Sequence, residues 1–240
     1  MPSAPFRNGL LSALTPADRE LFRPCLELVE LSAGQALAGC HSPPPYGYFL
    51  ESGLAATVLS SERGQAVEVG LIGREGFVGT PIILHVRQCP RATTVLVSGQ
   101  AYRIPAESLL GLTEASPGIR SRLLNFVHVF GIQISSTALA HARLQIERKL
   151  ARWLLMAQDR LGDDLAVGHD FFAAVLGVRR PGVTTALHIL EGEHLIRSQR
   201  KQITILNRQG LQAFAGPSYG IAEAEYRRIF DKPAQSAQAA

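Results

Sequence analysis

Cysteine is scarce in the 240-residue sequence, and lysine is absent from the first 142 residues. The three cysteines, Cys25, Cys40 and Cys89, are odd in number and widely spaced. This pattern argues against a disulfide framework, and the lack of a CxxC pair argues against a zinc or iron–sulfur centre. We therefore expect three reduced thiols in or near a core.

Short motifs of several enzyme classes are also missing. The sequence has no HExxH pair, no phosphate loop ending in GKS or GKT, and no CxxC. Acidic and histidine residues at positions 163–164 and 169–170 lie around the entry to a predicted helix, where capping and turn roles explain them. We therefore predict no catalytic residue and no metal site, and we do not expect an enzyme.

Long hydrophobic runs and targeting signals are lacking too. No run of about 18 consecutive apolar residues occurs, so we expect no membrane span. The N-terminal segment MPSAPFRNGL lacks the charged start and apolar stretch of a secretory signal. The remaining expectation is a folded cytoplasmic protein.

Positive charge is confined to the C-terminal part of the chain. Residues 1–142 hold ten Arg and ten acidic residues, for a net charge of zero. Residues 143–240 hold 14 Lys and Arg against 10 Asp and Glu, for a net charge of +4. Such an asymmetry favours a polyanionic partner for the C-terminal part.

The pattern of apolar residues changes twice along the chain, at about residue 27 and again at about residue 105. Residues 27–104 contain short, partly alternating apolar segments separated by glycines, which predict a sandwich, barrel or roll. From residue 105 the pattern is helical, with a long helix over about 116–142 and an amphipathic helix from 146. We place the domain boundary near residues 142–146, and the overall fold class is α+β.

The long helix carries apolar residues at steps of three and four. This near-heptad spacing is typical of a helix–helix seam. A helix packed on its own domain is the alternative, but the position between two domains favours a dimer interface. The predicted seam consists of Leu123, Val127, Phe130, Ile134, Ala138 and His141.

The segment GVRRPGVTTALHIL predicts a helix with one buried side. Val183, Ala186, Leu187 and Leu190 recur at i, i+3, i+4 and i+7. A shorter helix and a glycine turn precede this segment, and HLIRSQRKQITIL after it predicts a hairpin with a basic tip. Helix, glycine turn, helix and hairpin together indicate a winged helix-turn-helix.

In such a module the second helix enters the major groove of DNA with its N-terminal residues. Arginines there can contact guanine or phosphate, and threonines can contact phosphate or a thymine methyl group. Basic residues of the hairpin would contact the backbone. The predicted DNA-binding residues are Arg179, Arg180, Gly182, Thr184, Thr185, His188, Arg197, Arg200 and Lys201.

Over nearly its whole length the chain resembles Crp/Fnr-family transcription regulators. YFLESGLAATVL is similar to the central strand pair of that family, and FFAAVLGVRRPGVTTALHILEGEHLI follows its helix-turn-helix without a gap. The resemblance implies a β-roll of the cyclic-nucleotide-binding type at 1–115, a dimerisation helix and hinge at 116–145, and a winged helix-turn-helix at 146–225. Residues 226–240 are expected to form a disordered tail, because the final segment DKPAQSAQAA has a small polar composition.

The resemblance also implies a function. We expect a homodimer on a near-palindromic site in double-stranded DNA, with RNA polymerase as a further partner and no membrane association. A small effector in the β-roll would control DNA binding. The alternatives are a regulator that needs no ligand, and a sensor or interaction module that has lost sequence-specific reading of DNA.

The effector loop departs from members of the family that bind cyclic AMP. Gly79 matches a family glycine, but Thr80 stands where a glutamate holds the ribose, and Arg91 resembles the arginine that pairs with the cyclic phosphate. Ser135 matches an adenine-contacting serine, and Ile134 replaces a threonine. These departures argue against cyclic AMP and leave no cofactor assigned; a surface Arg91 paired with Glu68 or Glu75 is the alternative. The candidate effector residues are Gly79, Thr80, Arg91, Ala92, Thr93 and Ser135.

Overall fold

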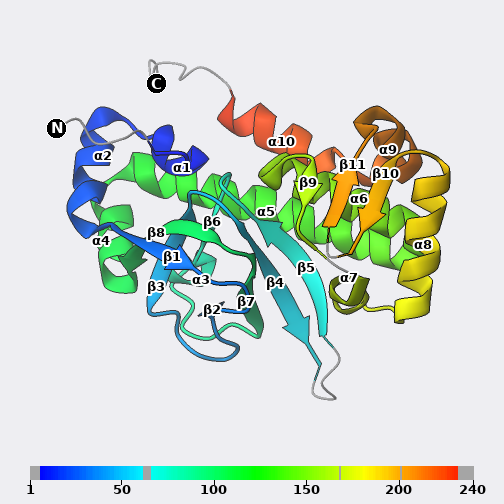
Figure 1. Ribbon diagram of the computed structural model, residues 1–240. Helices are drawn as coiled ribbons and strands as arrows, with labels where there is room; N and C mark the ends of the chain where they lie inside the picture. Colours follow the sequence, from blue (N-terminus) through cyan, green and yellow to red (C-terminus); the bar gives the residue numbers. More distant parts are fainter. Residues whose placement is uncertain (1–5, 62–65, 168, 201, 232–240) are drawn as a thin grey trace.

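The computed structural model describes residues 6–61, 66–167, 169–200 and 202–231 (Figure 1). Within these ranges an N-terminal region of two antiparallel sheets and a C-terminal helical region lie on either end of one long helix. This is the α+β arrangement predicted from the sequence. After the functions that the resemblance implies, the N-terminal region is called the sensor domain below, and the region from residue 146 is called the DNA-binding domain.

Two four-stranded antiparallel sheets form the sensor domain. Their strand orders are β1-β8-β3-β6 and β2-β7-β4-β5. Short alternating segments separated by glycines produce this roll, and its core includes the fully buried rings of Phe22, Phe49 and Phe77. The strands are β1 Glu27–Leu31, β2 Ala36–Ala38, β3 Tyr46–Leu50, β4 Leu54–Ser60, β5 Ala66–Ile72, β6 Phe77–Val78, β7 Arg91–Val97 and β8 Gly99–Pro105.

Short helices close the ends of the roll. Asn8 is buried, caps the first helix, and donates its side-chain amide to the carbonyl groups of Leu50 and Gly76. Thr15 caps the second helix, with Pro16 in its first turn, as these residue types favour. The helices are α1 Gly9–Ser12, α2 Pro16–Phe22, η1 Arg23–Cys25, α3 Thr80–Ile83 and α4 Ala106–Ala115. All three cysteines are free, and Cys40 is exposed rather than near a core.

The long helix α5, Pro117–Arg143, begins at a Ser116 cap whose hydroxyl accepts from the Ile119 amide. Leu123, Phe126 and Phe130 pack into the core of the sensor domain. The side-chain amide of Gln133 accepts from the Leu71 amide at 2.6 Å and donates to its carbonyl at 3.1 Å, which joins α5 to the edge of β5.

By length and composition alone, α5 could cross a membrane. An 18-residue window has a mean hydropathy of 1.4, but 44% of that window is buried inside the protein. The apolar residues that raise its hydropathy include those packed against the sheets. We therefore interpret α5 as a core helix of the sensor domain.

The DNA-binding domain begins at α6, Ile146–Leu161, and two residues separate this helix from the end of α5. A short strand, β9 Asp164–Leu165, joins the hairpin in a three-stranded sheet of order β10-β11-β9. The remaining elements are α7 His169–Leu176, α8 Arg180–Gly192, β10 Ile196–Gln199, β11 Gln202–Ile205, α9 Arg208–Ala215 and η2 Gly216–Ser218.

The two domains share one packed junction. Leu54 and Leu71 of the sensor sheet belong to the same buried cluster as Trp153, Phe172 and Leu176 of the DNA-binding domain. Helix α7 packs against β5 at this junction. The helix-turn-helix therefore has a defined position on the sensor domain.

The described part of the chain ends with a helix where the sequence predicted disorder from residue 226. Helix α10, Ile221–Phe230, lies against α5 (Figure 1), and His128 of α5 contacts Glu225 at 2.8 Å. The prediction is wrong for Tyr226–Phe230, because Tyr226 and Phe230 supply aromatic rings that a polar tail would lack. Residues 232–240 lie outside the described part of the chain.

Candidate nucleic-acid interface

Helix α8 has one buried side and one exposed side. Val183, Ala186, Leu187 and Leu190 are each at most 1% exposed, which confirms the stripe predicted from their spacing. They pack in the core that also holds residues of α6 and α7. The helix is therefore held on one side only, and its other side is available for a partner.

The exposed side of α8 presents the predicted polar residues. Arg179 is the N-cap, Arg180 opens the helix, and both are exposed, as are Thr185 and His188. The hydroxyl of Thr184 donates to the Arg180 carbonyl, and that of Thr185 donates to the Pro181 carbonyl. These internal bonds leave lone pairs of both hydroxyl oxygens available as acceptors.

Gly182 faces a packing partner. A Cβ atom at this position would lie 2.9 Å from Cδ1 of Ile146 in α6. Gly182 is one of the predicted DNA-binding residues. Helix α8 packs against the start of α6 at this point, so a larger residue here would displace the end of the Ile146 side chain.

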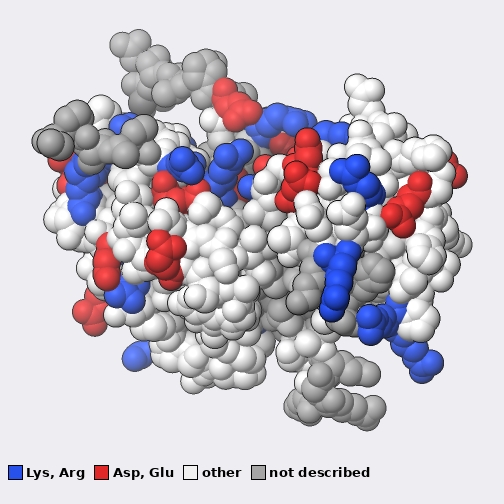
Figure 2. Space-filling model, viewed as in Figure 1, with Lys and Arg blue, Asp and Glu red and all other residues white. Residues whose placement is uncertain are grey.

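The hairpin β10–β11 forms the wing. The Ser198 amide donates to Glu191 Oε1 at 2.7 Å, which fixes the hairpin against α8. Arg197 and Arg200 are exposed on it, and Lys201 lies outside the described residues. In Figure 2 basic side chains gather over the start of α8 and the tip of the wing, on one side of the molecule. This surface matches a phosphate backbone in charge.

The predicted effector residues lie around a narrow cavity in the sensor domain. Its lining includes Gly79, Thr80, Arg91 and Thr93, together with Phe130 of α5, and its volume is about 30 Å³. Ligand pockets for drug-sized molecules are about ten times larger. Gly79 has φ of 124°, and a Cβ there would approach the Gly47 backbone at 3.1 Å, so the loop requires glycine.

Two features of this cavity disfavour a cyclic nucleotide. Thr57 and Thr93 are partners on the adjacent strands β4 and β7, and their hydroxyl groups lie 3.2 Å apart in its lining, which also includes the ring of Phe130. Thr80 supplies no carboxylate for a ribose. The residues present therefore do not fit cyclic AMP in this conformation.

The other predicted effector residues are placed differently. Ala92 lies in β7 but does not line the cavity, and Ser135 is exposed on α5 with its hydroxyl donating to the Gly131 carbonyl. The suggested pairing of Arg91 with Glu68 or Glu75 is not found. Glu68 accepts from Trp153, and Glu75 is paired with Arg160.

The predicted dimer seam is divided between two sides of α5. Leu123 and Phe130 are 2% and 4% exposed and point into the sensor core, so their assignment to a dimer interface is wrong.

Val127, Ile134, Ala138 and His141 are accessible or half-buried. They lie along one side of the helix with Leu124, Gly131 and Ala142, which are also accessible or half-buried. Steps of three and four through Leu124, Val127, Gly131, Ile134 and Ala138 give the seam a better register.

A buried carboxyl group lies at the junction of the two domains. Glu68 of β5 is 3% exposed, and its Oε2 accepts from Trp153 Nε1 at 2.5 Å. Burial raises the pKa of Glu68 to about 7, against the opposing effects of the Trp153 bond and of Arg152. Burial, and then Lys149, lower the pKa of the nearby His141. Sequence reasoning missed this contact, because nothing in the spacing of Glu68 and Trp153 indicates that they meet.

One enzyme-like pattern is present in the sequence. GPSYG at residues 216–220 has the GxSxG spacing of a hydrolase nucleophile. Ser218 lies in the 3-10 helix η2, not between a strand and a helix, and its hydroxyl donates to the Ala215 carbonyl at 2.8 Å. Its own carbonyl accepts from Arg152 at 2.9 Å. This serine has a structural role in joining α6 to the C-terminal segment.

Residues 148–214 match a family model described as the Crp-like helix-turn-helix domain. A search of curated proteins gives no match. Among solved structures, a putative Crp/Fnr-family regulator from Eubacterium rectale is 19% identical, with a TM-score of 0.64 over 84% of this chain and 95% of that chain. FixK2 from Bradyrhizobium japonicum is 15% identical, with a TM-score of 0.69 over 80% of this chain and 98% of its own.

A third similar structure is the c-di-GMP-responsive global regulator CLP of Xanthomonas campestris. It is 15% identical, with a TM-score of 0.65 over 80% of this chain and 99% of its own. At these identities the structural likeness establishes the fold. The family model identifies residues 148–214 as a Crp-like helix-turn-helix domain.

Proposed function

With a Crp-like helix-turn-helix domain at residues 148–214 in a chain of the Crp/Fnr fold, we propose that the protein is a transcription regulator that binds specific double-stranded DNA as a homodimer. The observation that carries this proposal is the exposed side of α8. Its arginines and threonines are accessible while its opposite side is fully packed. The basic wing beside it supplies contacts to phosphate.

The accessible side of α5 supports the proposed dimer. Gly131, Ser135 and Ala138 are small and exposed there, so a second copy of α5 can approach closely. Two copies related by a two-fold axis would present two recognition helices. Half-sites would then lie one helical turn, or a multiple of it, apart on a near-palindromic sequence.

The β-roll cavity supports a regulator that does not require cyclic AMP. Its small volume and the threonine at position 80 both disfavour a cyclic nucleotide. A regulator independent of that ligand is the form of the proposal that these observations favour.

The alternative is a module that has lost sequence-specific reading of DNA. Pro181 and Gly182 at the start of α8 are the features that favour it. The contact of Gly182 with Ile146 explains one of these two features by packing. Pro181 lies in the first turn, where its missing N–H group costs nothing.

Base reading is tested with the Arg180→Ala variant. On a duplex selected by the wild-type protein, we expect affinity to fall roughly 10- to 100-fold, since a bidentate arginine–guanine contact contributes about 1–3 kcal/mol. On a scrambled duplex the loss should be smaller. Arg87→Ala, which removes an exposed arginine of the sensor domain, is the control and should bind both duplexes like the wild type. An unchanged ratio between the two duplexes in Arg180→Ala would rule out base reading by Arg180.

A further inference from the structure

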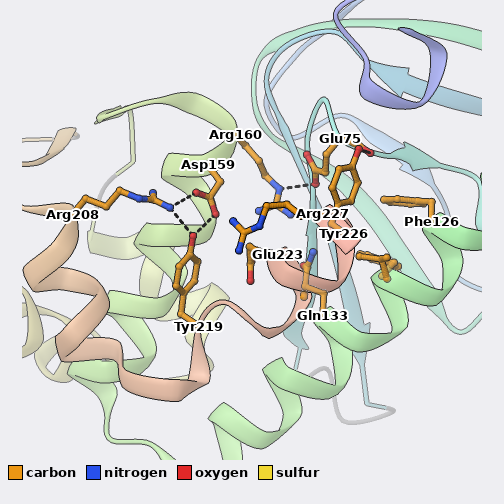
Figure 3. Close-up of a pocket in the computed structure, with 13 residues that line it drawn as sticks. Glu75, Phe126, Gln133, Asp159, Arg160, Arg208, Tyr219, Glu223, Tyr226 and Arg227 are labelled. Atoms are coloured by element: carbon orange, nitrogen blue, oxygen red, sulfur yellow. Dashed lines mark hydrogen bonds and ion pairs between the residues drawn. The ribbon is translucent and has the colours of Figure 1, made fainter. Parts of the chain in front are cut away.

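A second cavity lies where the two domains meet the C-terminal helix. Its volume is about 200 Å³, and it is lined from α5, from α6, from the turn before β6 and from the segment after α9 (Figure 3). We call it the junction cavity. An apolar cavity of about 150 Å³ accommodates a benzene ring. The junction cavity therefore has room for one ring with small substituents.

The wall formed by α5 is apolar and aromatic. Phe126 and Phe130 stack with ring centroids 5.8 Å apart and an interplanar angle of 14°. Val129 lies on the same side, and Ala222 of α10 faces the cavity as well. All four side chains are at most 5% exposed in the folded chain. Flat aromatic molecules pack well on such a wall.

The arginines that line the cavity differ in their partners. Arg160 donates to Glu75 Oε1 at 2.7 Å, and Arg208 pairs with Asp159 at 2.7 Å. Arg227 lines the cavity, is exposed, and has no hydrogen-bond or ion-pair partner for its side chain among the described residues. Figure 3 draws it between these two ion pairs. A guanidinium group in this position can pair with a carboxylate.

One buried acceptor of the cavity lining also lacks a donor. Glu75 Oε1 accepts from Arg160 and from the Gly73 amide, whereas Oε2 is buried without a hydrogen-bond partner in the described part of the chain. A buried carboxylate oxygen without a donor is unfavourable. This oxygen has almost no accessible surface, so a hydroxyl or amino group of a ligand would reach it once the Glu75 side chain turns toward the cavity.

We propose that the junction cavity binds a small monocyclic aromatic acid that carries a hydroxyl or amino group. Its ring lies against Phe126 and Phe130, its carboxylate pairs with Arg227, and its hydrogen-bond donor faces Glu75. The site is separate from the β-roll cavity, although Phe130 lines both. The proposal does not depend on DNA binding.

Calorimetric titration of the full-length protein without DNA tests the proposal. The probes are 3- and 4-hydroxybenzoate, with benzoate and phenol as the analogues that lack the donor and the carboxylate. We expect at least one hydroxybenzoate to bind, and both of its analogues to bind at least several-fold more weakly. Absence of heat for both hydroxybenzoates up to millimolar concentration would overturn the proposal.

Two arginine variants of α10 locate the binding site. Arg227→Gln should weaken hydroxybenzoate binding at least about tenfold and should remove the preference for hydroxybenzoate over phenol. Arg228→Gln is the matched control on the same helix, because Arg228 pairs with Glu225 and does not line the cavity. It should retain both affinity and preference. Equal binding by wild type and Arg227→Gln would show that the acid binds elsewhere, and would overturn the assignment.

Discussion

The β-roll and the helix-turn-helix differ in what their functional sides offer to a partner. In the β-roll, the cavity lined by Gly79, Thr80, Arg91 and Thr93 has a volume of about 30 Å³, and Thr57 and Phe130 also line it. In the helix-turn-helix, Arg179, Arg180, Thr185 and His188 are exposed. The DNA-reading surface is thus accessible while the β-roll is closed. This difference supports the proposal that DNA binding does not require a nucleotide in the β-roll.

The largest effect should come from a charge placed on the accessible side of α5, the helix that joins the two regions. Ala138→Glu places a carboxylate on the accessible side of α5, where the proposed dimer would bury it without a partner. We expect the dimer dissociation constant to rise roughly 100-fold or more, measured by sedimentation velocity across a concentration series. Binding to an inverted repeat should fall with it, since each half-site would be bound separately.

Asn125→Glu is the control for this variant. Asn125 is exposed on another side of α5, so the same charge should leave the dimer intact. If Ala138→Glu remained as dimeric as Asn125→Glu, the proposed interface would be wrong.

An intermediate effect is expected at the contact between the two regions. The pKa of Glu68 is raised from 4.5 to about 7 when the protein is folded, so the folded state binds this proton more tightly than the unfolded state does. The corresponding stability is present below about pH 4.5 and is lost as the pH rises through 7. Between pH 5 and pH 8 this loss amounts to roughly 2–3 kcal/mol.

Glu68→Gln keeps an acceptor for Trp153 and removes the titration. Denaturant unfolding at pH 5 and pH 8 should show that the wild type loses more stability than the variant by that amount. Identical pH dependence in the two proteins would mean that Glu68 does not titrate between these values.

The smallest expected effect tests the difference in charge between the two regions. Arg200→Gln on the wing should weaken binding to all duplexes a few-fold and reduce the slope of log affinity against log salt by about 0.9, the value for one phosphate contact. Arg87→Gln in the sensor domain should leave the slope unchanged. A slope equal to the wild-type value in Arg200→Gln would exclude a phosphate contact by this wing residue.

Local pattern was sufficient to predict much of the DNA-binding domain. The stripe of Val183, Ala186, Leu187 and Leu190 has a helical period, and a glycine turn and a hairpin flank it at short range. The break between α5 and α6 also lies where one helical pattern in the sequence ends and another begins. Such features depend on residues near each other in the sequence.

The features that the sequence did not predict depend on contacts between residues that are far apart in the sequence. Periodicity showed that α5 has apolar residues at steps of three and four, but not which of them the β-roll would bury, so Leu123 and Phe130 were placed on the wrong side. The meeting of Glu68 with Trp153 joins positions 85 residues apart. The return of α10 onto α5, and with it the junction cavity, also arises from packing at long range.

Selection of bound duplexes from a random pool, with and without cyclic AMP, tests the central claim most directly. The accessible recognition helix and the closed β-roll lead us to expect the same enriched inverted repeat in both arms. Enrichment only in the presence of cyclic AMP would contradict the account of the β-roll. Enrichment in neither arm would contradict the claim that the exposed side of α8 reads DNA without a ligand.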